Sequence, residues 1–158
     1  MSQLGLYLEL TKPRIITMIL VTTALGFFLG SPGELSLWRM LWTLVGTALA
    51  AGGAGTLNHY LERDVDAMMR RTQTRPLPTG GLRAGPTLSF GFGLIIVGQV
   101  VLVVGTNLLT AWLALLTAFL YVVIYTPMKR MTWLNTSMGA IPGALPPVGG
   151  WTAASGEL

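Results

Sequence analysis

The chain has 158 residues, of which 52% are hydrophobic and only 10% are charged, and its mean hydropathy is +0.63. Soluble domains carry about 25% charged residues, so this composition excludes an ordinary water-soluble domain and predicts an all-α, polytopic bundle of transmembrane helices. The formal net charge is +4, and the absence of cysteine excludes disulfides and thiolate metal sites.

Long uncharged runs define the expected spans. A helix needs roughly 20 apolar residues to cross ~30 Å of hydrocarbon. The run over 84–128 is long enough for two spans, with a break at the turn-forming trio Gly105-Thr106-Asn107. The sequence predicts a single transmembrane domain over residues 1–158 with five spans, near residues 15–33, 40–61, 86–105, 108–126 and 133–153.

The basic residues are distributed very unevenly about these spans. Nine of the ten lie on one side of the membrane, and only Arg39 lies on the other. The positive-inside rule makes the basic side cytoplasmic, which predicts a bacterial-type plasma-membrane protein with its N-terminus and its 63–86 loop in the cytoplasm. Because topology accounts for the positive charge, nucleic acid is not an expected partner.

The segment before the first span contains Thr11-Lys12-Pro13 and Arg14. Pro13 suits the first turn of a helix, where its missing N–H is no loss. The basic side chains of Lys12 and Arg14 can either anchor the chain at headgroup depth or face a phosphate.

The second span is rich in small residues, which allow helices to approach closely in lipid. The same residues can instead leave room for a flat or greasy ligand. They are Gly46, Ala50, Gly52, Gly53, Ala54 and Gly55.

The end of this span carries the residues that point to chemistry. Asn58, Glu62 and Asp66 are spaced at i, i+4 and i+8, so on a helix they share one face. Their oxygens are of the kind that Mg²⁺ prefers when it bridges to substrate phosphates. Asp64 lies off this stripe and joins it only if the helix ends near Arg63.

Arginines follow in the long polar loop over residues 63–86, among them Arg70, Arg71 and Arg75. Arginine binds phosphate through two donors at once. Carboxylates, Mg²⁺ and arginines at the mouth of apolar helices predict a lipid diphosphate site, with the tail in the bundle. The alternative is a solvated loop with ion pairs.

The fifth span contains Pro142, Pro146 and Pro147. These prolines predict a kink or a broken hydrogen-bond ladder. Such backbone is tolerated in a membrane only where protein or a cavity satisfies it, so the pattern predicts an internal cavity beside this span.

The string NHYLERDVDAMMRRTQTRPLPTG resembles the first acidic motif of the UbiA-type intramembrane prenyltransferases, read here as Asn58, Glu62 and Asp66 followed by Arg71-Thr72 and Arg75-Pro76-Leu77. Three further strings resemble the protoheme IX farnesyltransferase branch: LTKPRI, RDVDAMM and YTPMKRMTWLNTSMGAIPGALPPVGGW. The resemblance covers nearly the whole chain in order.

This resemblance implies transfer of a farnesyl group from farnesyl diphosphate to a vinyl group of heme B, giving heme O, in contact with membrane lipid. It implies Mg²⁺ as the cofactor, bound with diphosphate by Asn58, Glu62 and Asp66, with Asp64 as a further candidate ligand. It also implies contacts to the diphosphate from Arg71, Arg75, Lys129 and Arg130. The catalytic residues that it implies are Asn58, Glu62, Asp66, Arg71 and Arg75.

Two features depart from the family pattern. Glu62 stands where much of the superfamily has aspartate, which lengthens the arm of that ligand. The family is a nine-helix bundle with a second acidic motif in its latter half, whereas this chain has no Asp or Glu between Asp66 and Glu157. The second metal-binding half implied by the resemblance is thus absent from this sequence: either the chain is a fragment of a longer gene product with a missing C-terminal half, or a partner supplies that half. The alternatives are a prenyltransferase for a quinone-ring or chlorophyll-type acceptor, and a non-catalytic fragment that binds lipid or heme.

Overall fold

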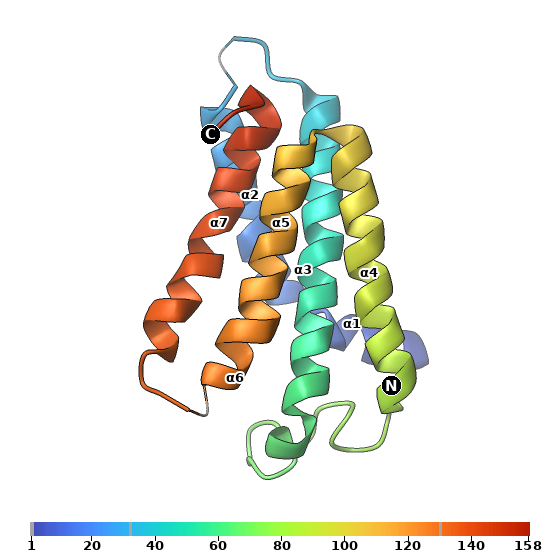
Figure 1. Ribbon diagram of the computed structural model, residues 1–158. Helices are drawn as coiled ribbons and strands as arrows, with labels where there is room; N and C mark the ends of the chain where they lie inside the picture. The colour runs from blue at the N-terminus through green and yellow to red at the C-terminus, as the bar shows by residue number, and fades with distance from the viewer. Residues whose placement is uncertain (1, 32, 130) are drawn as a thin grey trace.

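A computed structural model describes residues 2–31, 33–129 and 131–158, and helices account for its regular structure (Figure 1). In chain order these are α1 (Gln3–Leu10), α2 (Pro13–Leu29), α3 (Leu37–Asp66), α4 (Ala84–Gly105), α5 (Leu108–Phe119), the π-helix η1 (Leu120–Tyr125), α6 (Thr126–Met128) and α7 (Asn135–Ser155). The predicted all-α bundle is confirmed. Helix α1 was not expected from the sequence.

Three of the predicted spans are helices that are long and apolar enough to cross a membrane: α3, α4 and the continuous segment Leu108–Met128. The helices α1 and α2 qualify only as a bent pair, with an angle of 48° at their junction. Helix α7 has the length but not the hydropathy, because of its glycines and prolines. The chain is an integral membrane protein.

The bend between α1 and α2 follows from Pro13, the first residue of α2. A residue before proline is steered away from the right-handed helical region, and Lys12 adopts φ 57° and ψ 64°, in the left-handed region. A non-glycine residue in this conformation costs on the order of 1–2 kcal/mol. The strained residue is Lys12, whose side chain turns toward α3.

Helices α3 and α4 pack closely through small residues, which was the first of the two interpretations of the small-residue segment in the second span. A Cβ atom on Gly53 would stand 2.6 Å from the carbonyl oxygen of Gly91, and one on Gly98 would stand 2.8 Å from the backbone nitrogen of Ala50. The second interpretation, room for a ligand, applies to a different face of α3, where Ala51, Ala54 and Gly55 border an open space. One small-residue segment thus serves both purposes.

Helix α7 packs against α2 and α5 on the opposite side of the bundle from α4 (Figure 1). It stays helical from Asn135 to Ser155 despite its three internal prolines, so the ladder loses hydrogen bonds without a break in the helix. Its upper part touches α2 through Gly26, where an added Cβ atom would lie 2.0 Å from the carbonyl oxygen of Pro147. Its lower part lines a cavity.

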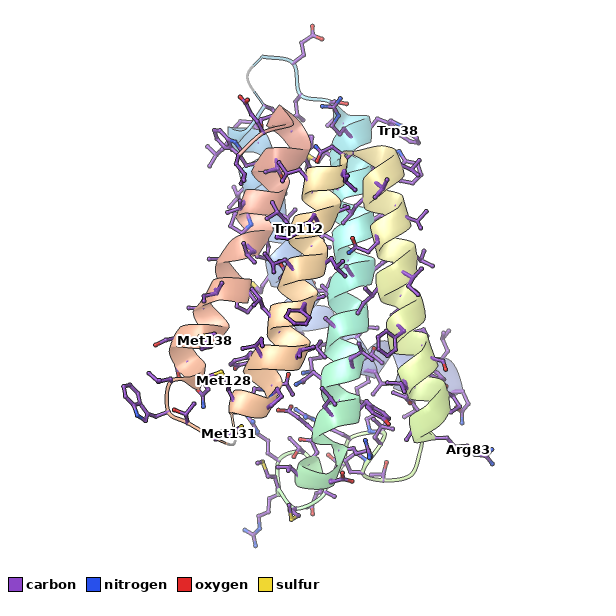
Figure 2. The ribbon with its side chains drawn as sticks, in the orientation of Figure 1. Trp38, Arg83, Trp112, Met128, Met131 and Met138 are labelled. Atoms are coloured by element: carbon purple, nitrogen blue, oxygen red, sulfur yellow. The ribbon has the colours of Figure 1, made fainter. Side chains whose placement is uncertain are left out.

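Two of the connections between helices lie at the same end of the bundle. The 67–83 loop and the link from α6 to α7 are at the lower end in Figure 1, and the α2–α3 loop is at the upper end. Figure 2 shows Arg83 pointing outward at the lower end and Trp38 pointing outward at the upper end. This arrangement places the acidic end of α3 beside both lower connections.

Candidate functional site

The site is built on the last two turns of α3. This helix runs through Asp66, so the side chains of Asn58, Glu62 and Asp66 follow one another along one face. All three side chains are mostly buried: Asn58 is fully buried, and the exposed fraction of the side chain is 6% for Asp66 and 14% for Glu62. Each of the three has a basic partner from a different segment of the chain.

The first partner is Lys12, at the strained junction of α1 and α2. Its Nζ donates to Oδ1 of Asn58 and, at 3.5 Å, to the hydroxyl of Tyr121. The amide nitrogen of Asn58 in turn donates to Oγ1 of Thr126 at 3.1 Å. Asn58 is fully buried, so these contacts fix the orientation of its side chain.

The second partner is Lys129, which follows α6. Its Nζ lies 3.0 Å from Oε1 of Glu62 and 4.8 Å from the centre of the Tyr125 ring. This cation–π contact and the ion pair together hold a flexible side chain over the stripe.

The third partner is Arg75 from the 67–83 loop. Its Nη1 lies 2.6 Å from Oδ2 of Asp66, and the hydroxyl of Thr72 donates to the backbone oxygen of Asp66 at 3.0 Å. Pro76, which follows Arg75, is buried. The loop is therefore tied to the end of α3 by the Thr72 hydrogen bond and the Arg75 ion pair.

The structure does not bring every predicted site residue to this stripe. Asp64 faces away with 78% of its side chain exposed, and it pairs with Arg63 at 3.7 Å. Arg71 is exposed in the loop and is not among the residues that contact the three stripe side chains. Arg130 lies outside the described residues.

Three polar residues at the site were not assigned to it from the sequence: Tyr121, Tyr125 and Thr126. They come from the π-helix and the residue after it, and the Thr126 hydroxyl donates to the Tyr121 carbonyl at 2.8 Å. The two tyrosine rings stack with their centres 5.6 Å apart. A π-helical turn often marks a functional site, but its extra residue per turn leaves no sequence signal that helical periodicity can detect.

Lys12 was assigned either to topology or to phosphate, and its place beside Asn58 and Tyr121 favours the second interpretation. His59 is buried, and its Nδ1 has no hydrogen-bond partner among the described residues.

An apolar cavity of about 480 Å³ opens beside the stripe. Its walls come from α2, α3, α5, η1 and α7, with Lys12, Tyr121 and Tyr125 at the end nearest the charges. Ligand pockets for small molecules have volumes of roughly 300–1,000 Å³ and are mostly apolar with a few polar groups. The cavity that the prolines of α7 predicted is confirmed.

Mg²⁺ fits this site as a partner of a diphosphate and not as a resident ion. Among the described residues, no group of three or more His, Asp or Glu side chains is placed to hold a metal ion. Residues four apart on α3 are separated by about 6 Å along the axis, so one ion cannot be bound by the whole stripe. One or two carboxylates plus phosphate oxygens is a common arrangement for Mg²⁺, and Glu62 and Asp66 offer such oxygens.

Comparison with known proteins identifies the class to which this fold and site belong. The UbiA prenyltransferase family matches residues 19–158, and the chain belongs to this family. The predicted family is confirmed.

Particular relatives are protoheme IX farnesyltransferases. The chain is 48% identical over 161 residues to that of Solibacter usitatus, covering 96% of this chain and 55% of the relative. It is 51% identical over 157 residues to that of Salinibacter ruber, covering 96% and 54%. The chain therefore spans about half the length of the curated relatives it matches.

Solved structures show the same fold. A UbiA homolog from Archaeoglobus fulgidus bound to GPP and Mg²⁺ superposes with a TM-score of 0.77 at 22% identity, over 98% of this chain and 53% of that one. The same homolog bound to DMAPP and Mg²⁺ superposes with a TM-score of 0.76. At this identity the likeness establishes the fold alone.

Proposed function

We propose that this chain forms one half of the active site of a membrane prenyltransferase that transfers a farnesyl group from farnesyl diphosphate to heme B, producing heme O. The observation that carries the proposal is the stripe of Asn58, Glu62 and Asp66, each paired with a cation, at the mouth of an apolar cavity. A charged mouth above an apolar cavity matches a substrate with a charged head and a hydrocarbon tail.

The residues of the mouth have complementary roles toward a diphosphate. Glu62 and Asp66 offer oxygens to Mg²⁺, which supplies positive charge to the phosphate oxygens when it is bound. Lys12, Lys129 and Arg75 then exchange their contacts with the stripe for contacts with phosphate, because an anion with several negative charges competes well for them. Fixed cations of this kind stabilise the charge that develops on a leaving group.

The cavity serves the hydrocarbon tail. Ile15 and Ile19 of α2 and Leu113 of α5 contribute apolar surface to its walls. The stacked rings of Tyr121 and Tyr125 stand between the charged mouth and this apolar space. Their faces are suited to an electron-poor allylic carbon, since aromatic rings attract positive charge.

The proposed reaction balances as a substitution followed by hydration. The carbon–oxygen bond of farnesyl diphosphate breaks, and its electron pair leaves with the diphosphate. The vinyl π electrons of heme B form the new carbon–carbon bond, and the electron-poor inner vinyl carbon accepts a lone pair from water, which then loses a proton. The choice of heme as acceptor is supported by the likeness to protoheme IX farnesyltransferases.

The rest of the metal and diphosphate site is proposed to come from a segment equivalent to the other half of the relatives. This chain matches 55% of the Solibacter usitatus relative, and after Asp66 it supplies no further carboxylate side chain until Glu157. Assays of the proposed function therefore use the chain in its full reading frame, with whatever is encoded beyond Leu158.

Acceptor competition tests the proposal. Membranes that contain the protein are given farnesyl diphosphate, Mg²⁺ and equal amounts of heme B and 4-hydroxybenzoate, and the products are identified by mass. We expect hydroxyethylfarnesyl heme. Prenylated 4-hydroxybenzoate with no heme product would refute the acceptor and retain the prenyltransferase, whereas no prenylated product with any acceptor would leave a non-catalytic binding protein.

A further inference from the structure

One backbone carbonyl in the cavity wall has no partner in its own helix. In an α-helix the carbonyl of residue i accepts from the N–H of residue i+4, and the tighter alternative uses residue i+3. For Gly143 these residues are Pro147 and Pro146, and proline has no N–H. The carbonyl oxygen of Gly143 is therefore left without either helical donor.

This carbonyl belongs to a residue of the cavity lining. Gly143 borders the cavity, and a Cβ atom built on it would meet no atom within 4 Å. Gly143 is exposed on this wall, and in a membrane an unpaired carbonyl is tolerated only where a cavity or a neighbour satisfies it. The cavity at this point therefore favours a ligand that donates a hydrogen bond.

A second acceptor lies at the same depth on α2. Helices α2 and α7 touch at Gly26 and Pro147, and again at Gly30 and Trp151, so the two helices run parallel. Four residues earlier on each helix, one turn closer to the charged mouth, Thr22 is therefore level with Gly143. Thr22 also lines the cavity, and its hydroxyl proton is donated to the carbonyl of Ile19 at 2.9 Å. Its oxygen is left to accept.

We propose that the Gly143 carbonyl, with the Thr22 oxygen, binds the water molecule that hydrates the farnesylated vinyl group. The proposal rests on the proposed function, whose last step consumes one water inside an apolar cavity. A water held in a cavity wall needs two to four polar partners. Two acceptors occupy both of its protons and leave its lone pairs for the electron-poor vinyl carbon, after which one proton is released.

The exchange Pro147→Ala tests this assignment. Alanine restores an N–H to residue 147, which bonds the Gly143 carbonyl and withdraws it from the cavity, and Pro147 itself is not part of the cavity lining. Without the water, the adduct loses a proton from carbon and gives a farnesyl heme lighter by one water. Losing one hydrogen-bond acceptor is expected to lower the ratio of hydrated to dehydrated product roughly tenfold.

The measurement is that product ratio, determined by mass spectrometry on the protein in its full reading frame. Pro86→Ala is the matched control, because it makes the same exchange in the first turn of α4, away from the cavity, and should leave the ratio unchanged. Thr22→Val is a second variant that keeps the side-chain shape and the backbone, and it should lower the ratio in the same direction.

The outcomes separate this inference from the proposed function. An unchanged ratio in both Pro147→Ala and Thr22→Val overturns the water site. Slower transfer with an unchanged ratio also overturns it, because the carbonyl then acts on the transferring cation and not on water. Failure of the unsubstituted protein to farnesylate heme refutes the proposed function itself.

Discussion

Replacing Asp66 with asparagine removes one negative charge from the stripe and preserves its shape. The Asp66 carboxylate is 94% buried and lies 2.6 Å from Arg75, so water cannot easily take over its role. A lost hard-oxygen ligand beside a transferring group is worth several kcal/mol. At about 3 kcal/mol the turnover falls by roughly two orders of magnitude.

The matched variant is Asp64→Asn, which makes the same chemical change two residues earlier on the same helix. Asp64 is mostly exposed and pairs with Arg63 at 3.7 Å, and such surface pairs contribute about 0–1 kcal/mol. Its turnover should fall less than about fivefold. The assay is Mg²⁺-dependent release of diphosphate at equal protein levels in membranes, and near-normal Asp66→Asn beside an inactive Asp64→Asn would refute the geometry of the site.

Two further predictions concern topology and packing. Gln73→Cys should be protected from a membrane-impermeant thiol reagent added from outside, while Ser36→Cys is labelled; the reverse pattern would show that the site faces the exterior. Gly53→Ala should lower the free energy of unfolding by about 1–3 kcal/mol, because its Cβ atom would stand 2.6 Å from the Gly91 carbonyl oxygen. Thermal unfolding in detergent measures this, with Gly93→Ala as the control in open space; equal stability of the two variants would contradict the close α3–α4 contact.

The stripe could be predicted from the sequence because it depends only on helical spacing. Once α3 continues through Asp66, the side chains of Asn58, Glu62 and Asp66 must share a face, and Asp64 must leave it. The cavity could be predicted for a similar reason, because Pro146 and Pro147 remove backbone donors that a lipid environment cannot replace. Local chemistry is sufficient for both.

The residues that contact the stripe are brought there by long-range packing, so helical spacing alone could not identify them. Lys12 reaches Asn58 because it adopts a left-handed backbone conformation before Pro13, which composition and spacing do not reveal. Arg71 and Arg75 are equivalent by residue type, but the fold of the loop brings Arg75 to Asp66 and leaves Arg71 exposed. Tyr121 and Tyr125 reach the site through a π-helix that interrupts the helical period.

The central claim is that the charged mouth and the apolar cavity together bind a prenyl diphosphate through Mg²⁺. Calorimetric titration of the purified protein with farnesyl diphosphate, in Mg²⁺ and in EDTA, tests this claim most directly, with farnesol as the comparison ligand. The account predicts binding that requires Mg²⁺ and the diphosphate and that inorganic diphosphate competes away. Equal binding of farnesyl diphosphate in EDTA, or equal binding of farnesol, would contradict it.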